Sequence, residues 1–226
     1  MMSAAMTEDI SKMWRIFPVG LDCVLELRCL SPVGATEKLP ALTLHHRAQH
    51  YGDLDALKRA FEQDALAKNN AGYNVYVNLN PIKPEFSGHA CADNDIQCRD
   101  LLLVDIDRQG TKKCPADQLE LDAADQLANE ITTFLSTRSF LNPFKVMSGN
   151  GYHLYYVLNR LPNTPKTTAG IQKLLHLLAF QFNNSTVSVD TTVANASRIT
   201  KIPGTVMRKG EETPDRPYRR AYVCDE

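Results

Sequence analysis

Apolar and polar residues alternate along residues 21–30 (LDCVLELRCL), a pattern with the two-residue period of a β-strand. Asp53 then stands where a helix would begin, because its carboxylate can accept a free backbone N–H, and Leu54, Leu57 and Phe61 follow at helical spacing. Residues 73–80 (YNVYVNLN) are rich in β-branched and aromatic side chains and are followed by Pro81. This part of the chain is therefore expected to form a strand, a helix and a strand.

The next stretch predicts a loop, a buried strand and a helix. Residues 81–99 contain two prolines and a glycine, which favours a long and functional or mobile loop. Residues 101–107 (LLLVDID) are almost wholly apolar, as in a central strand. Pro115 suits the first turn of a helix. Apolar residues at helical spacing follow it, namely Ala124, Leu127, Ala128, Ile131 and Leu135.

A hairpin and a second helix complete the predicted sheet. Residues 144–148 (FKVMS) and 152–158 (YHLYYVL) flank Gly149-Asn150-Gly151, a strong hairpin signal. A helical pattern runs through Ile171, Leu174, Leu175, Leu178 and Phe182, and the short strand TVSVD ends at Asp190. The order strand, helix, hairpin, helix, strand indicates an α/β (α+β) fold, a mixed sheet with helices on one face.

Composition and charge narrow the class of protein. The chain has 226 residues, 43% apolar and 23% charged, which is ordinary for a globular protein and excludes a disordered, collagenous or coiled-coil chain. We expect one compact unit or one domain with two lobes. The 25 Lys and Arg nearly cancel the 26 Asp and Glu, but residues 198–220 hold seven basic and three acidic residues. This asymmetry favours a polyanionic partner.

The sequence shows no signal for secretion or for insertion into a membrane. No apolar run approaches the roughly 20 residues of a membrane helix, and residues 1–10 lack the basic and apolar regions of a secretion signal. Six cysteines occur without a Cys-x-x-Cys pair, so we expect reduced thiols. The protein is therefore expected to be cytoplasmic, without a membrane partner.

Three aspartates are candidate metal ligands. Asp105 and Asp107 are two residues apart on a predicted strand, so both side chains point to the same face. Two carboxylates so placed repel each other unless a cation lies between them, and their oxygens suit Mg²⁺ or Mn²⁺. Asp190, at the end of another strand, is a candidate third ligand; its alternative role is that of a turn or helix-cap residue.

The hairpin supplies a second group of candidates. If Asn150-Gly151 forms the two-residue turn, Ser148 lies opposite His153 on one face, and Met147 pairs with Leu154 on the buried face. A hydroxyl, an imidazole and backbone N–H groups beside a glycine would make a cradle for a triphosphate. The alternatives are a histidine on an exposed strand face and a Ser–His nucleophile, for which no acidic partner is evident.

Four cations follow Asp190: Arg198, Lys201, Arg208 and Lys209. Arginine offers paired donors to phosphate and lysine a point charge, so cations beside metal-binding carboxylates favour a polyphosphate ligand. The alternative is a solvated basic surface, with the last 35 or so residues forming an irregular flap or linker. His89, Cys91, Cys98 and Cys114 are candidate ligands of a structural Zn²⁺, although their spacing lacks the close cysteine pair typical of zinc sites.

Taken in order, these motifs resemble the catalytic module of the archaeo-eukaryotic primase superfamily, the primase-polymerases of plasmids, phages and mobile elements. LVDID matches the family's first motif, Ser148 and His153 resemble its second, and Val189-Asp190 its third. Residues 76–81 (YVNLNP), Asn195, Arg198, Lys201 and the stretch 202–205 (IPGT) also resemble the mobile-element branch. The resemblance spans about residues 70 to 210. Ser148 and His153 are further apart here than in the family motif.

The resemblance implies a single catalytic domain over residues 1–226. An N-terminal α/β lobe would cover about 1–98, an RRM-like catalytic lobe about 99–210, and a tail or linker 211–226, with the active site between the lobes. It implies template-directed nucleotidyl transfer, as a DNA primase or polymerase acting on single-stranded DNA in replication of a mobile element or in repair. A helicase domain or protein downstream is a further implied partner.

The resemblance also gives each residue a role. Two divalent ions, Mg²⁺ or Mn²⁺, would lie on Asp105, Asp107 and Asp190. The incoming NTP or dNTP would contact a set of hairpin and loop residues, namely Ser148, Gly149, Asn150, His153, Arg198, Lys201 and Lys209. Two other functions use the same residues: a metal-dependent nuclease or phosphodiesterase, and a catalytically silent DNA-binding replication initiator.

Overall fold

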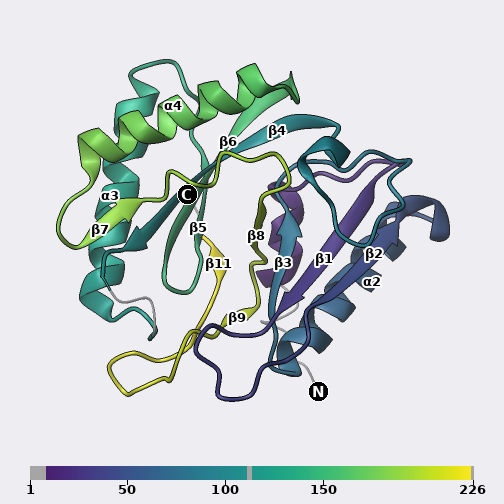
Figure 1. The fold of residues 1–226 in the computed structure, drawn as a ribbon, viewed down its shortest axis with the longest axis horizontal. Helices are drawn as coiled ribbons and strands as arrows, with labels where there is room; N and C mark the ends of the chain where they lie inside the picture. Colours follow the sequence, from purple (N-terminus) through teal and green to yellow (C-terminus); the bar gives the residue numbers. More distant parts are fainter. Residues whose placement is uncertain (1–8, 111–113, 225–226) are drawn as a thin grey trace.

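The computed structural model describes residues 9–110 and 114–224, which form two large β-sheets with helices on their outer faces and one two-stranded sheet (Figure 1). The first sheet has the antiparallel order β2-β1-β3-β8. Its lobe consists of the 3₁₀ turns η1 (Lys12–Arg15) and η2 (Ala48–His50), the helix α2 (Leu54–Asn70), and the strands β1 (Val24–Leu30), β2 (Leu42–Arg47), β3 (Asn74–Asn78) and β8 (Ile199–Lys201).

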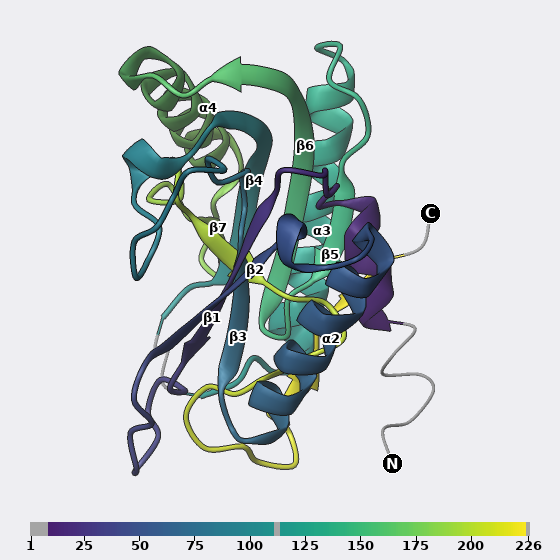
Figure 2. The ribbon, with the colours of Figure 1, turned by 90° about the vertical axis from the view of Figure 1, so that its right-hand side faces the viewer.

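Helix α2 begins where the sequence predicts. The Asp53 side chain accepts a hydrogen bond from the Ala56 N–H at 2.7 Å, which satisfies one of the free donors of the first turn. Leu57 and Phe61 are fully buried against β1 and β3, and α2 lies along one face of that sheet (Figure 2). Strand β2 was not predicted, because its residues LTLHHR are mostly half-buried and their alternation of apolar and polar residues stops after His45.

The second sheet has the order β11-β5-β6-β4-β7, with antiparallel neighbours throughout. Its lobe consists of β4 (Cys98–Arg108), α3 (Gln118–Ser136), β5 (Phe144–Met147), β6 (Gly151–Pro162), α4 (Pro165–Phe182), β7 (Val187–Val189) and β11 (Tyr222–Val223). The succession β4-α3-β5-β6-α4-β7 and the sheet order β5-β6-β4-β7 are those of an RRM-like, or ferredoxin-like, unit. The predicted α+β class and its RRM-like half are confirmed.

Both helices of this lobe have built-in caps. Asp117 accepts from the Glu120 N–H at 2.9 Å and Glu120 accepts from the Asp117 N–H at 2.9 Å, a capping box that starts α3 at Gln118 rather than at Pro115. Thr164 caps α4, and Pro165 occupies its first turn. The two helices cover the same side of the sheet (Figure 1).

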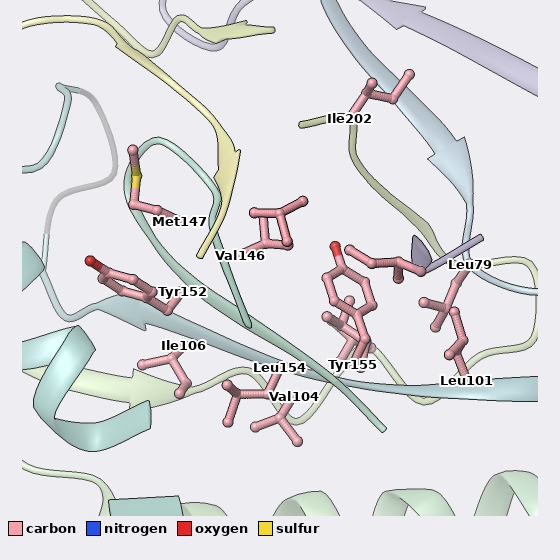
Figure 3. Close-up of a cluster of buried hydrophobic side chains, with 14 of the residues drawn as sticks. Leu79, Leu101, Val104, Ile106, Val146, Met147, Tyr152, Leu154, Tyr155 and Ile202 are labelled. Atoms are coloured by element: carbon pink, nitrogen blue, oxygen red, sulfur yellow. The ribbon is translucent and has the colours of Figure 1, made fainter. Parts of the chain in front are cut away.

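The two faces of the second sheet, followed along β4 and β6, pack against different parts of the molecule. Val104, Ile106 and Leu154 point toward the helices, whereas Tyr155 points to the opposite side (Figure 3). On that side Tyr155 lies near Leu79 and Leu101, which belong to the junction with the first lobe. Buried residues of both lobes form one continuous hydrophobic cluster. The lobes are therefore joined by packing rather than by a linker alone.

The β5–β6 hairpin forms as predicted, but its register differs. Met147 pairs with Tyr152 and Val146 with His153, so Gly149-Asn150 is the two-residue turn and Ser148 lies opposite Gly151. The expected pairs Ser148 with His153 and Met147 with Leu154 are wrong. Because the shift is two residues along the ladder, Ser148 and His153 remain on the same face, as diagonal neighbours. Gly149, with φ 106°, takes the first turn position, where a type II′ turn requires a positive φ.

The chain after Asp190 is a set of short strands rather than an irregular flap. It crosses to the first sheet as β8, forms the β9 (Val206–Met207) and β10 (Arg219–Arg220) pair, and returns to the second sheet as β11. Two buried side chains, Asn69 and Asn74, attach it to the first lobe. Asn69 exchanges two hydrogen bonds with the backbone of Val206, and Asn74 does the same with Arg208, at 2.7–2.9 Å. We call this pair the asparagine clamp.

The segment before β4 is an ordered cover on the first sheet. It contains the 3₁₀ turn η3 (Asp93–Asp95), and β4 already begins at Cys98. Arg47 donates to the carbonyl oxygens of Pro84 and Phe86, and Glu26, itself fully buried, accepts from the Cys91 N–H at 2.7 Å. The predicted loop thus packs on the strands that precede it in the chain.

All six cysteines lie in the described part of the chain and are free thiols. Within residues 9–110 and 114–224, every helix falls short of the length and apolar character that crossing a membrane requires.

Gly151→Ala is expected to lower the free energy of unfolding by about 1–3 kcal/mol, the usual cost of overpacking. A Cβ at this position would lie 2.1 Å from the carbonyl oxygen of Ile106 on β4, so backbone must move. Urea denaturation measures the change. Gly52→Ala is the matched control, because its Cβ would meet nothing within 4 Å. Equal losses in the two variants would contradict the close approach of β4 and β6.

Candidate active site

A cavity of about 280 Å³ lies between the lobes and collects most of the predicted site residues. Strands of both sheets and the turn of the hairpin contribute to its wall. The predicted residues that line it are Asp105, Asp107, Ser148, Asn150, His153, Arg198, Lys201 and Lys209. Its other lining residues are Leu30, Tyr76, Leu103, Ile199, Thr200 and Met207. Residues of the LVDID strand, of the hairpin and of the segment 198–209, far apart in the sequence, thus meet at one place.

Asp105 and Asp107 sit on the cavity face of β4, while Ile106 between them is fully buried on the helix side. Their side chains are 25% and 22% exposed, so both carboxylates are only partly hydrated. Each faces a cationic or cation-forming group. Nε2 of His153 lies 3.4 Å from Oδ1 of Asp105, and Nζ of Lys209 lies 3.6 Å from Oδ2 of Asp107. Each of these contacts offsets part of the repulsion between the two carboxylates.

His153 is held by a pair of buried hydroxyls that the sequence analysis missed. Its Nδ1 lies 3.0 Å from the Tyr155 hydroxyl and 3.2 Å from Oγ1 of Thr200, and these two oxygens are 2.6 Å apart. Burial raises the pKa of Tyr155, so its hydroxyl keeps its proton. With Nδ1 engaged, Nε2 is directed at Asp105. Tyr155 could have been found from its place two residues after His153 on one strand; Thr200 comes from the other lobe.

Lys201 is buried at the back of the cavity. Its Nζ donates to the Val206 carbonyl at 3.0 Å and lies 5.7 Å from the centre of the Tyr76 ring. Burial, and secondarily the charge of Arg208, lowers the pKa of Lys201 well below its usual value of 10.5. Burial, with a smaller contribution from the charge of Asp105, raises the pKa of Tyr76 to about 12.

The hairpin turn presents an amide donor to the cavity. Oδ1 of Asn150 accepts from the Ala116 N–H at 2.8 Å, whereas its Nδ2 is buried with no hydrogen-bond partner among the described residues. An unsatisfied buried donor on a residue of the cavity wall is a candidate partner for a ligand oxygen. The Ser148 hydroxyl donates to the Gly151 carbonyl at 3.1 Å. Gly149, also predicted to contact the nucleotide, is not among the residues that line the cavity. It packs against Met207, since a Cβ at position 149 would lie 2.4 Å from Cβ of Met207.

Asp190 lies beside the cavity but does not line it. Its N–H donates to the Asp105 carbonyl at 2.8 Å, which places Asp190, the residue after β7, next to Asp105 on β4. Its Oδ1 accepts from the N–H and the hydroxyl of Thr192 at 2.8 and 2.7 Å, the arrangement of a turn-stabilising aspartate. Arg198 is one of the lining residues of the cavity, and its Nη2 donates to the Thr192 carbonyl at 2.7 Å.

Within residues 9–110 and 114–224, no group of three or more His, Cys, Asp or Glu side chains is arranged to hold a metal ion. Asp105 and Asp107 still fit divalent cations, because two carboxylates on one strand face share a polar cavity. The four zinc candidates are not brought together. The Cys91 thiol donates to the Ala92 carbonyl and the Cys98 thiol to Asp100, while the Cys114 sulfur accepts from Arg108. His89 is exposed.

The lowered pKa of Lys201 predicts a pH dependence of stability. Between the folded-state pKa and 10.5 the unfolded chain binds a proton that the folded chain lacks, so stability rises with pH there, by up to about 1.4 kcal/mol per pH unit. Lys201→Met removes the titrating group. The free energy of unfolding of the wild type minus that of the variant is therefore expected to increase with pH. Urea midpoints between pH 7 and 10 measure this, since other groups titrate alike in both proteins. Parallel curves would contradict it.

Comparison with known proteins gives a likeness of fold. No protein-family model and no curated protein matches the sequence. Among solved structures, primase RepB′ superposes with a TM-score of 0.51 at 13% identity, over 97% of this chain and 56% of that one. The polymerase domain of Mycobacterium tuberculosis Ligase D, in complex with DNA, superposes with a TM-score of 0.50 at 15% identity, over 95% of this chain and 80% of that domain.

The two solved structures are a primase and a polymerase domain, and the chain spans just over half the length of the primase. Both superpositions extend over nearly all of the present chain, so they include both lobes and the cavity between them. The chain therefore has the two-lobed fold of primase and polymerase domains, the fold that its motif resemblance to the archaeo-eukaryotic primase superfamily implies.

Proposed function

We propose that the protein is a template-directed nucleotidyltransferase, a DNA primase or polymerase that joins NTPs or dNTPs on single-stranded DNA. The observation that carries this proposal is the single cavity in which two carboxylates, a histidine and several cations meet. A nucleoside triphosphate requires this combination, because its negative charge must be neutralised next to the group that reacts. The fold shared with a primase and a polymerase domain supports the same reaction class.

In this proposal Asp105 and Asp107 hold the divalent ions, Mg²⁺ or Mn²⁺, and Asp190 completes the ligand set. Asp190 is close enough to join, since its backbone is bonded to that of Asp105. To do so its side chain must turn away from Thr192. Bound divalent ions would supply Lewis-acid stabilisation of the attacking and leaving oxygens. Lys209, 3.6 Å from Asp107, then neutralises either the carboxylate or the phosphate beside it.

The remaining cavity residues are assigned to the triphosphate. His153 donates from Nε2 in the tautomer whose Nδ1 accepts from the hydroxyl of Tyr155 or Thr200. Asn150 offers its unpaired Nδ2, and Arg198 adds positive charge from the other lobe. Lys201, whose pKa burial lowers, gains its charge when the negative charge of a bound triphosphate lies beside it. Hydrogen bonds from charged donors of this kind contribute about 1.5–3 kcal/mol each. Primer and template would lie in the open part between the lobes, next to the basic residues 198–220.

The double variant Asp105→Asn and Asp107→Asn is expected to abolish synthesis, with a fall of roughly a hundredfold or more, the order seen when one electrostatic contact to a transition state is lost. The assay supplies single-stranded template, labelled nucleotides and Mg²⁺ or Mn²⁺, with and without primer. The unprimed reaction separates priming from extension. Asp100→Asn is the matched control, because Asp100 lies on the same strand and contacts Cys98 and Arg160 outside the cavity.

Three outcomes would contradict the proposal. Shortening of the template, lost in the double variant, would indicate a nuclease or phosphodiesterase. DNA binding without synthesis under either metal would indicate a silent replication initiator. Equal synthesis in the wild type and the double variant would place the reaction outside this cavity.

A further inference from the structure

The segment between β7 and β8, residues 190–198, carries two of the proposed site residues at its ends, Asp190 and Arg198. It leaves the second sheet after β7 and enters the first sheet at β8. Its residues lie outside the strands of both sheets. Backbone hydrogen bonds hold its two ends, from the Asp190 N–H to the Asp105 carbonyl and from the Leu79 N–H to the Arg198 carbonyl, both at 2.8 Å. Side-chain hydrogen bonds then set the direction of the Arg198 guanidinium.

Arg198 is fixed by two contacts within this segment. Its Nε donates to Oδ1 of Asn195 at 2.9 Å, and its Nη2 donates to the Thr192 carbonyl at 2.7 Å. Thr192 in turn bonds to Asp190. Asn195 is thus the side chain that sets the plane of the guanidinium on its Nε side.

The position of Asn195 is set from outside the segment, by Asp93 of η3. Oδ1 of Asp93 accepts from the N–H and the hydroxyl of Ser197, both at 2.8 Å, and from Nδ2 of Asn195 at 3.5 Å. Partial burial raises the pKa of Asp93, but the hydrogen bonds from Ser197 and Asn195 outweigh it and leave the pKa below its usual value. Beneath the segment, buried Arg99 donates to the Ala194 carbonyl at 2.8 Å.

We propose that Asp93 is a positioning residue for triphosphate binding: through Asn195 and Ser197 it holds Arg198 in the direction that lines the cavity. This inference rests on the proposed function, because it assigns Arg198 to the triphosphate. It gives the segment before β4 a task beyond covering the first sheet. Asp93 itself is exposed and touches no part of the cavity wall, so its effect must pass through the segment.

Asp93→Ala is expected to weaken binding of inorganic tripolyphosphate, measured by calorimetry, about three- to tenfold, the usual range for one lost hydrogen-bond contribution. In the Arg198→Ala background the same change should have almost no effect, because the two residues act as one unit. Asp95→Ala is the matched control. It removes a carboxylate from the same turn, where Oδ2 of Asp95 accepts from the Ala92 N–H at 2.8 Å.

A second measurement tests the positioning without any ligand. Hydrogen exchange at the Arg198 Nε–H, followed by NMR, should accelerate in Asp93→Ala and stay unchanged in Asp95→Ala, because this N–H is bonded to Asn195. Wild-type affinity in Asp93→Ala, with a loss in Arg198→Ala, would overturn this inference and leave the proposed function intact. Absence of tripolyphosphate binding by the wild type would overturn both.

Discussion

Repulsion between two carboxylates on one face of a strand is the constraint around which the cavity is arranged. Asp105 and Asp107 occur at that spacing in the sequence, and the residues that compensate their charge come from distant segments. The β4–β6 ladder places His153 directly opposite Asp105, and the segment after β9 brings Lys209 to Asp107. Partly hydrated carboxylates are costly without such neighbours, so the positions of the hairpin and of the C-terminal segment both matter to this strand.

The asparagine clamp explains how a segment made of strands of only two or three residues can place a charged side chain at a defined position. A side-chain amide that exchanges two hydrogen bonds with a backbone unit acts like one rung of a β-ladder. Asn74 holds Arg208 in this way, and Lys209 is the next residue. Lys209 also forms a bridge with Val33. The lysine at Asp107 is thus located by backbone contacts on the first lobe rather than by attraction alone.

The periodic spacing of apolar residues made much of the fold predictable. The features that were not predicted depend on contacts between segments distant in the sequence. The strand around LLLVDID, the hairpin and the helices follow patterns that local sequence determines. Local sequence does not determine the position of the hairpin turn, since both Gly149-Asn150 and Asn150-Gly151 are good turn dipeptides. In the structure with the first turn, Gly149 packs on Met207 and Gly151 on Ile106, and both contacts are with segments distant in the sequence. The hydroxyl of Thr200 was missed because it reaches His153 only when the lobes are together.

The crossing of the chain at β8 has a consequence for how the protein folds. Strand β8 supplies the edge of the first sheet beside β3, with Tyr76 paired to Lys201, although the whole RRM-like unit lies between these residues in the chain. During synthesis the first sheet therefore emerges without its last strand. The edge of β3 that pairs with β8 stays unpaired until the second lobe has been made. Completion of the first sheet therefore depends on the second lobe, and the cavity, which both lobes line, depends on the same step.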